Sequence, residues 1–454
     1  MKNKSIRDFA FAATGRAPDA MRRSVVLSAA AAAAGLEFLP GLAHAQNYPP
    51  LGNFPAGVEG NSVFVGVSLP LTGAFSAEGK DQQLGYELAF EHLNSGRLVG
   101  KIPELKGKGV LGKAIAFGVI DDETKPEPAI QGQTRFLKNN KAILMTGCFS
   151  SAVTIALGKL AQREKVLYMA GPAGSDDVTG KDCQRYSFRS QPSTTMASLA
   201  LAPVLAERLG KNKKVAYLVP DYTFGHTQFE SMARLTAPMG WTTVSKQVCP
   251  IGTADFSTYL LNIANSGCDV FVNCTVGNDC STSTKQAVSF GVTKRAALVV
   301  PTLQPFLAQQ LGPEITQNVY GVMDFWWSLA ETNELAKIFV DDFEVKHKYK
   351  PYWPAHIAYS QMMIWAVAVE RAKTFYPPEV IKMLEARVPI KTSLGDVMYR
   401  PEDHQLIRPV PVMRGKKPSE MKSKDDYYEI VKIIPGAQAV PPLAEGVCKM
   451  GDVV

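Results

Sequence analysis

The chain lacks the short motifs by which many enzymes are recognised. Its 454 residues contain no GxSxG elbow, no HExxH pair, no complete phosphate-binding P-loop and no aspartate-rich metal loop. The six histidines are scattered along the sequence. These absences disfavour hydrolase and metalloenzyme chemistry, so the sequence predicts a binding protein rather than an enzyme.

The sequence also lacks the context that a dinucleotide cofactor needs. Gly107, Gly109 and Gly112 match the GxGxxG expression, but that fingerprint must follow a strand and open a helix. Here the match follows a Lys- and Gly-rich stretch and leads into a predicted strand at Ala114. We interpret it as a surface loop and expect no cofactor.

Neither sign of charge is in large excess. The formal net charge is +7, and residues 1–45 carry six basic and three acidic side chains, which leaves 43 basic against 39 acidic residues, or +4, for the rest. An excess this small does not predict nucleic-acid binding. The content of 46% hydrophobic and 20% charged residues is that of a globular chain long enough for two domains.

No hydrophobic run reaches the roughly 20 residues of a membrane-spanning helix. The apolar stretch 25–35 follows the twin arginines 22–23, and the Ala-His-Ala of residues 43–45 has the small-x-small pattern of a cleavage site. Residues 1–45 are therefore predicted to be a removed export signal, which places the mature chain in the periplasm. The twin arginines permit a Tat signal, whereas a start at Met21 gives a Sec signal, and both routes stay open.

The seven cysteines are not spaced as metal ligands, because those between residues 249 and 280 form no CxxC pair and have no histidine partner. In an oxidising compartment, cysteines favour disulfides over a metal site. Cys148 and Cys183 lie near the ends of consecutive predicted strands, so they are the first candidates for a bridge. The odd number leaves at least one thiol unpaired or joined to another chain.

What the chain does contain is a regular alternation of strand and helix patterns. The unit 63–96 reads as a buried strand from Val63 to Leu69, a Gly-rich loop and an amphipathic helix from Lys80 to Asn94. Later strands are predicted at 114–120, 142–145, 166–170, 186–189, 215–219, 242–248, 270–274 and 297–300, and most are separated by helices. The alternation predicts an α/β fold with parallel strands and right-handed crossovers. Three helices near 332–347, 355–373 and 378–386 then suggest two lobes, each discontinuous in sequence.

Two loops at the carboxyl ends of predicted strands are candidates for a ligand site. The first is Thr146–Ala152, where Gly147 allows a sharp turn and Ser150 is placed to cap a helix. The free amides of Ser151 and Ala152 are suited to a carboxylate, so helix capping and ligand binding both stay open. The second is the Ala-Gly-Pro-Ala-Gly-Ser-Asp segment of residues 170–176.

The segment 63–96 also carries a specific pattern, LPLTGxFxxxGxxxxxGxELAxExxN. It resembles the first strand-loop-helix of the leucine/isoleucine/valine-binding protein family, the type I periplasmic solute-binding proteins. The resemblance runs from about Val63 to about Pro435 and implies two Rossmann-like lobes joined by a three-crossover hinge, with Asp324–Trp327 at one crossing. It divides the chain into signal 1–45, extended arm 46–60, lobe 1 at 61–190 plus 328–395, lobe 2 at 191–327 plus 396–434, and tail 435–454.

The same resemblance assigns ligand-binding positions. In the family, the turn that matches Gly147–Ser151 contributes hydroxyl and amide groups to the solute carboxylate, and the second loop adds a small residue and a threonine. The threonine is missing here. The resemblance and the loops that contain these motifs together give the following candidates: Phe149, Ser150, Ser151, Ala173, Gly174 and Ser175.

In the second lobe, Asp221–Gly225 resembles the family loop that places an aromatic ring over the solute, and Phe224 is the matching ring. Gly277 lies in another expected crevice loop. Tyr359 matches a family tyrosine on a helix near the cleft, although packing in the core is an equal alternative.

Two departures from the family pattern bear on the solute. The acidic residue that holds an amino-acid ammonium group is replaced by the Thr-Leu-Gln of residues 302–304, which makes Gln304 a candidate contact. An aromatic position in the first loop is occupied by Glu78, which is either an alternative partner for an ammonium or hydroxyl group or a helix-start charge favoured by the dipole.

Together these features predict a periplasmic solute-binding component of an ABC importer of the branched-chain amino-acid type. The solute would be a small carboxylate, either an amino acid or a related organic or aromatic acid, captured by closure of the lobes. The resemblance implies ABC permease and ATPase subunits as partners. The alternative is a periplasmic ligand sensor of the same fold that signals to a membrane receptor.

Overall fold

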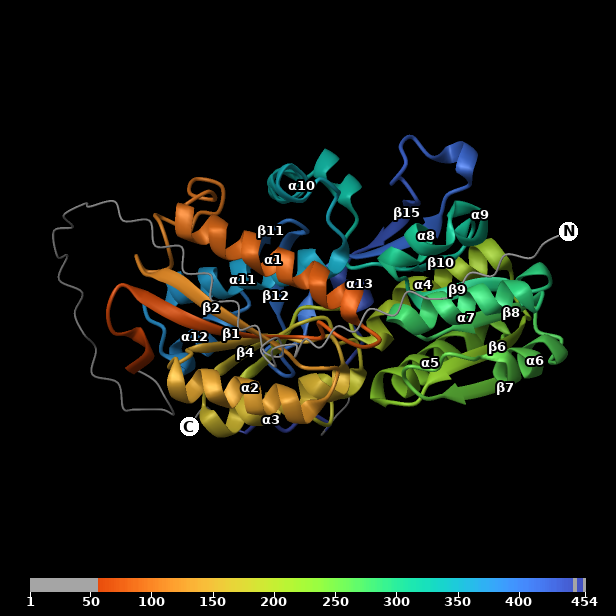
Figure 1. Ribbon diagram of the computed structural model, residues 1–454, viewed down its shortest axis with the longest axis horizontal. Helices are drawn as coiled ribbons and strands as arrows, with labels where there is room; N and C mark the ends of the chain where they lie inside the picture. The colour runs from red at the N-terminus through yellow and green to blue at the C-terminus, as the bar shows by residue number, and fades with distance from the viewer. Residues whose placement is uncertain (1–55, 444–446, 452–454) are drawn as a thin grey trace, which may run out of the picture.

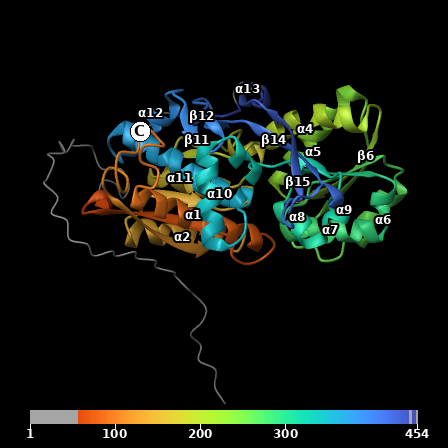
Figure 2. The same ribbon diagram turned by 90° about the horizontal axis from the view of Figure 1, so that it is seen from above.

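The computed structural model describes residues 56–443 and 447–451. The predicted signal and most of the predicted arm, residues 46–55, lie outside the described residues, and Ala56–Val58 form a short 3₁₀ helix. In the described part of the chain, no helix combines the length and apolar character needed to cross a membrane. The chain forms two α/β lobes side by side, joined along one region (Figures 1 and 2).

The first lobe is built on a five-stranded parallel sheet in the order β2-β1-β3-β4-β5. Its strands are β1 (Ser62–Leu69), β2 (Ala114–Asp121), β3 (Leu144–Gly147), β4 (Leu167–Ala170) and β5 (Ser187–Arg189). One face is covered by α1 (Ser76–Ser95) and α11 (Trp353–Ala372), and the other by α2 (Pro126–Asn139) and α3 (Ser151–Glu164) (Figure 1). The strands are buried on both faces, as parallel strands require.

The second lobe is built on a seven-stranded mixed sheet in the order β15-β14-β10-β9-β8-β6-β7. Its strands are β6 (Lys214–Pro220), β7 (Thr242–Cys249), β8 (Val270–Asn273), β9 (Ala297–Thr302), β10 (Tyr320–Val322), β14 (Val410–Gly415) and β15 (Tyr428–Ile434). Its helices are α4 (Thr194–Leu209), α5 (Thr223–Thr236), α6 (Ser257–Asn265), α7 (Gly277–Ser289), α8 (Pro305–Leu311) and α9 (Pro313–Thr316). The parallel part, β7-β6-β8-β9-β10, repeats the strand order of the first sheet, so the predicted α/β fold of two Rossmann-like lobes is confirmed.

Alternate side chains of the second sheet enter two separate cores. Val215, Tyr217 and Val219 of β6 pack with α4 and α5, whereas Ala216 and Leu218 of the same strand join the large core that extends through both lobes. This alternation is the period of two that a strand covered on both faces must show. The two faces of the sheet are therefore closed by different helices.

Within residues 56–434, the chain passes between the lobes three times, near Ser190, Asp324 and Arg408. After α10 (Glu334–His347), α11 and α12 (Pro377–Glu385), a small sheet is formed by β11 (Ile390–Thr392), β12 (Gly395–Tyr399) and β13 (Leu406–Ile407). Arg189 at the end of β5 forms a bridge with Gln405, which keeps this segment beside the first lobe. These pairings keep residues 395–407 beside the first lobe. They favour a boundary between the lobes near Arg408 rather than the predicted one between residues 395 and 396.

The predicted disulfide between Cys148 and Cys183 is wrong. Cys183 is bonded to Cys448, 265 residues away in the C-terminal segment that follows α13 (Gly436–Ala439), while Cys148 is a buried free thiol. Cys148 directly follows β3 in the first lobe, and its Sγ lies 2.7 Å from the Thr154 hydroxyl. The bond ties the end of the chain to the first lobe, although α13 packs on α4 of the second.

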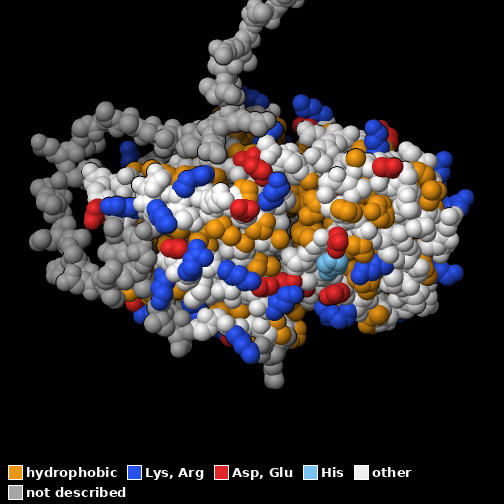
Figure 3. All heavy atoms as spheres, turned by 60° about the horizontal axis from the view of Figure 1, so that its bottom comes forward, with side chains coloured by type: hydrophobic (Ala, Val, Ile, Leu, Met, Phe, Trp, Pro, Cys, Tyr) orange, Lys and Arg blue, Asp and Glu red, His pale blue; other side chains and the backbone are white. Residues whose placement is uncertain are grey.

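The surface shows no field of a single sign on the face drawn in Figure 3. Lys and Arg side chains are interspersed with Asp and Glu, and hydrophobic side chains reach the surface between them (Figure 3). This face therefore has no continuous basic track.

Candidate functional site

A small cavity lies where the two lobes face each other. Ten residues line it: Phe149, Ser151, Pro172, Gly174, Gln191, Tyr222, Phe224, Val276, Thr302 and Trp353. Its volume is about 10 Å³, which is about the space for one water molecule. Four of the predicted residues, Phe149, Ser151, Gly174 and Phe224, are among those that line it.

The amino end of α3 lies at this cavity. Ser150 occupies the N-cap position, yet its hydroxyl makes no capping hydrogen bond. The first backbone bond of the helix runs from Thr154 N to Ser150 O at 2.9 Å, so the amides of Ser151, Ala152 and Val153 have no partner within the helix. An uncommitted hydroxyl beside free amides and the positive end of a helix dipole suits an anion such as a carboxylate.

The second predicted loop is fixed against the first. The Ser175 amide donates to the Ser151 hydroxyl at 3.1 Å. The buried Arg189 guanidinium donates to the carbonyl oxygens of Ala173, at 3.2 Å, and of Ser175. Burial lowers the pKa of Arg189 to about 10, so the side chain stays charged at neutral pH. Ala173 and Ser175 are thus brought next to the cavity, although neither lines it.

Ser175 also joins the two lobes. Its hydroxyl lies 2.8 Å from the hydroxyl of Thr223 at the start of α5, and Thr223 donates to the Asp177 carboxylate. The neighbouring Gly174 leaves space for the Phe224 ring, because a Cβ at residue 174 would lie 2.9 Å from that ring. The predicted aromatic cover from the second lobe therefore rests directly on the loop of the first.

A second contact between the lobes is made by the residues that follow Val276, which lines the cavity. The Asn278 amide donates to Ala74 O at 3.0 Å, and a Cβ on Gly277 would lie 2.5 Å from the same oxygen. The Gln304 side chain faces the Gly277 amide at 3.5 Å and donates to Thr302 O at 2.7 Å. Gly277 and Gln304 take part in this contact and do not line the cavity.

Glu78 is buried in the first turn of α1 but is not among the residues that line the cavity. Its Oε2 has no hydrogen-bond partner, and no cation lies within ion-pair distance of it in the described structure. Burial raises the pKa of Glu78 from 4.5 to about 7, and the nearby Asp81 adds to the shift. Both roles predicted from sequence stay open, because Glu78 lies in the first turn of α1, where the helix dipole favours a carboxylate.

We expect Glu78→Gln to change how stability depends on pH. The folded-state pKa is above the unfolded value, so the folded state binds the extra proton, and stability falls as pH rises from about 4.5 to about 7. Glutamine mimics the protonated form. The variant should match the wild type near pH 4.5 and exceed it at pH 8 by up to about 3 kcal/mol, at about 1.4 kcal/mol per pKa unit.

Urea unfolding at several pH values measures this difference. Glu91→Gln is the control, because Glu91 is exposed on the same helix and paired with the surface Lys346, and its loss should change stability by no more than about 1 kcal/mol. A Glu78→Gln profile parallel to that of the wild type would show that Glu78 is ionised in the fold.

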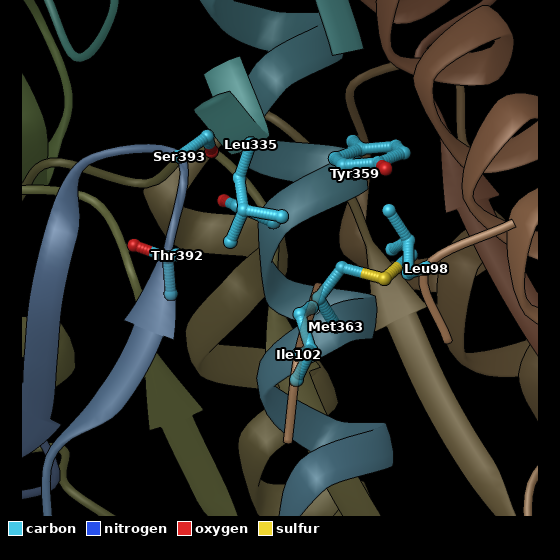
Figure 4. Close-up of a pocket in the computed structure, with 8 residues that line it drawn as sticks. Leu98, Ile102, Leu335, Tyr359, Met363, Thr392 and Ser393 are labelled. Atoms are coloured by element: carbon cyan, nitrogen blue, oxygen red, sulfur yellow. The ribbon is translucent and has the colours of Figure 1, made fainter. Parts of the chain in front are cut away.

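Tyr359 is placed away from the cleft. Its hydroxyl bonds His92 Nδ1 at 2.8 Å inside the first lobe. It lines a separate small cavity with Leu98, Met363 and other residues of that lobe, and Figure 4 shows it there. The structure thus supports the packing alternative, and the predicted ligand contact of Tyr359 is not supported.

Several lining residues were not predicted. Gln191 comes from the first crossover, Tyr222 from the turn before α5, and Trp353 from the start of α11. Trp353 donates its indole N–H to Leu303 O at 3.1 Å and stacks on Phe149 with 5.9 Å between ring centres. None of the ten lining residues carries a charge, which agrees with the missing acidic residue at 302–304.

A family model described as a periplasmic binding protein matches residues 62–422. Among curated relatives, Leu/Ile/Val-binding protein homolog 1 of Brucella suis biovar 1 (strain 1330) is 22% identical over 339 residues, which cover 74% of this chain and 86% of the relative.

Solved structures share the fold. An amino acid ABC transporter substrate-binding protein from Pseudomonas fluorescens Pf-5 has a TM-score of 0.76 at 23% identity, over 86% of this chain and 100% of that one. An ABC transporter solute-binding protein from R. palustris in complex with benzoate has a TM-score of 0.71 at 18% identity, with the same coverage. Because the family model spans both lobes and the three crossovers, the chain belongs to the periplasmic binding protein family, whose members bind solutes rather than transform them.

Proposed function

We propose that the protein is the periplasmic solute-binding component of an ABC importer and captures a small carboxylate-bearing solute between its lobes. The observation that carries the proposal is the amino end of α3, where Ser151 lines the interlobe cavity and the adjacent Ser150, which does not line it, has a hydroxyl without a capping bond. The carboxylate would bond this hydroxyl and the amides of Ser151 and Ala152. Phe224 would cover the solute from the second lobe.

Capture requires the lobes to move. Sites for small molecules usually measure about 300–1,000 Å³, whereas this cavity measures about 10 Å³. Contacts such as Asn278 N to Ala74 O, at 3.0 Å, must therefore break for a solute to enter. A solute that bonds α3 and packs on Phe224 touches both lobes, so it would favour the closed arrangement.

The relatives support an importer but leave the solute open. One structural neighbour is named as an amino acid transporter protein, and another was solved with benzoate. The uncharged lining of the cavity favours an acid without an ammonium group over a standard amino acid. Permease and ATPase subunits of the importer would be the partners, and the signal at residues 1–45 would deliver the chain to the periplasm.

We expect Ser150→Ala to weaken carboxylate binding by about 10- to 100-fold. The variant removes one hydrogen bond to a charged group, which contributes about 1.5–3 kcal/mol. A thermal-shift screen of carboxylic acids on the mature protein identifies a binder, because a ligand at 100 times its Kd adds about 2.7 kcal/mol of stability. Isothermal titration then compares that binder with both proteins.

Ser289→Ala is the matched control, because Ser289 lies exposed on α7, outside the cleft. It should bind as the wild type does. If carboxylates stabilise the wild type and Ser150→Ala equally, the carboxylate site is not at the amino end of α3.

A further inference from the structure

Gln191 is a buried polar residue that the fold leaves unsatisfied at the cleft. It lies on the first crossover between β5 and α4, is 5% exposed and lines the interlobe cavity. Its Oε1 has no hydrogen-bond partner in the described structure. A buried acceptor without a donor is costly, and a solute in the cavity could supply the donor that the described chain does not.

The crossover holds the backbone of Gln191 in a defined place. The Gln191 backbone carbonyl accepts a hydrogen bond from Gln405 Nε2 at 3.0 Å, and Gln405 Oε1 accepts one from the buried Arg189 at 2.7 Å. The Gln191 amide nitrogen lies 3.9 Å from where a Cβ on Gly174 would be. Gln191 is thus beside the Gly174–Phe224 contact, and the residue that follows Gly174, Ser175, donates its amide to the Ser151 hydroxyl.

The charge of the cavity restricts what Gln191 can bind. None of its lining residues is acidic or basic. A buried ammonium group requires a carboxylate partner, whereas a hydroxyl needs only a neutral acceptor. An amide oxygen is such an acceptor.

We propose that Gln191 determines specificity by accepting a hydrogen bond from a neutral donor of the solute close to its carboxylate, which makes a 2-hydroxy acid the preferred class over the matching amino acid. This inference rests on the proposed function, because the carboxylate at α3 sets the position of the neighbouring group. The aromatic walls formed by Phe149, Tyr222 and Trp353 favour a flat apolar body for the rest of the solute.

The test uses solutes that differ at one group. Isothermal titration of the mature protein compares lactate, alanine and propionate, and separately 3-phenyllactate, phenylalanine and 3-phenylpropionate. In the wild type, the hydroxy acid of a series should bind at least tenfold more tightly than both its partners. Gln191→Leu should reduce this preference to less than threefold, and Gln191→Glu should reverse it towards the ammonium-bearing member.

Gln131→Leu, on the exposed face of α2, is the matched control and should change none of these ratios. A structural role for Gln191 is tested by the melting temperature without solute. If Gln191 serves the solute, Gln191→Leu melts at the wild-type temperature or above it, because no internal hydrogen bond of the side chain oxygen is lost. A fall of several degrees would identify a structural residue and overturn the inference.

The outcomes separate this inference from the proposed function. Carboxylates that bind through Ser150 without any preference for the hydroxy acid, or with equal preference in Gln191→Leu, overturn the role of Gln191 alone. If no member of either series binds the wild type, the role of Gln191 is overturned for these acids. The wider screen with Ser150→Ala then decides whether the carboxylate site also fails.

Discussion

Removing the Cys183–Cys448 bond should lower the free energy of unfolding by about 2–5 kcal/mol. The bond closes a loop with a sequence separation of 265 residues, so it restricts the unfolded chain strongly. It also holds the C-terminal segment against the first lobe, where Arg185 donates to Gly451 O. The double variant Cys183→Ser/Cys448→Ser avoids a new free thiol and should show the full loss in urea unfolding.

Cys268→Ser is the control, because Cys268 is a partly buried free thiol remote from this bond. Its unfolding midpoint should stay close to that of the wild type. Wild-type protein treated with a reductant should unfold like the double variant. A double variant as stable as the oxidised wild type would mean that the bond adds nothing to the native fold.

The fold was predictable because parallel strands leave a strong local signal. Their buried runs of β-branched residues and the turns after them fixed most strand positions to within two residues, as for β1 and β6. Helix α4 was missed. It is apolar on nearly all sides and contains Pro203, so it shows no amphipathic period, because both α5 and the sheet bury it.

The site was predictable only in part, for a related reason. Loops that follow parallel strands meet at one edge of a sheet, so the loops of Phe149, Ser151 and Gly174 could be placed together. Gln191 and Trp353 come from a crossover and from a helix start, and only the packing of the two lobes brings them to the cavity. The sequence around Gln191 and around Trp353 contains no motif that predicts a ligand-binding residue.

The disulfide and the burial of Glu78 also could not be predicted from local sequence. Cys183 pairs with a residue 265 positions away, and such a distance in sequence leaves no signal in spacing. Glu78 was correctly singled out as unusual, but its burial follows from the contact of α1 with α7 of the other lobe. Contacts between lobes are long-range consequences of topology and not of local propensity.

Arg408→Leu should cost about 3–5 kcal/mol, because it leaves a buried carboxylate without its partner. Arg408 is fully buried and lies 3.0 Å from Asp324 Oδ1, and it also donates to the Asp324 carbonyl. A further hydrogen bond of 3.5 Å reaches Ser190 O. The Arg408 side chain thus bonds residues of the other two crossovers from its own position on the third. Urea unfolding measures the free energy that is lost when this side chain is removed.

The loss should depend on pH in a defined direction. Burial already raises the pKa of Asp324 to about 6 with Arg408 present, and removing the cation raises this pKa further. The variant then binds a proton on folding, so its deficit should be largest at pH 8 and smaller at pH 5. Arg408→Leu/Asp324→Asn removes the charge and should recover part of the stability.

The exposed pair of Arg387 and Glu402 supplies the control, because surface ion pairs contribute about 0–1 kcal/mol. Arg387→Leu should therefore unfold nearly as the wild type does at both pH values. A similarly small effect of Arg408→Leu, or a deficit that grows as pH falls, would mean that the Asp324 charge is not held by Arg408. In the lobe opening proposed above, the Arg408–Asp324 pair would hold the three crossovers together while the lobes move.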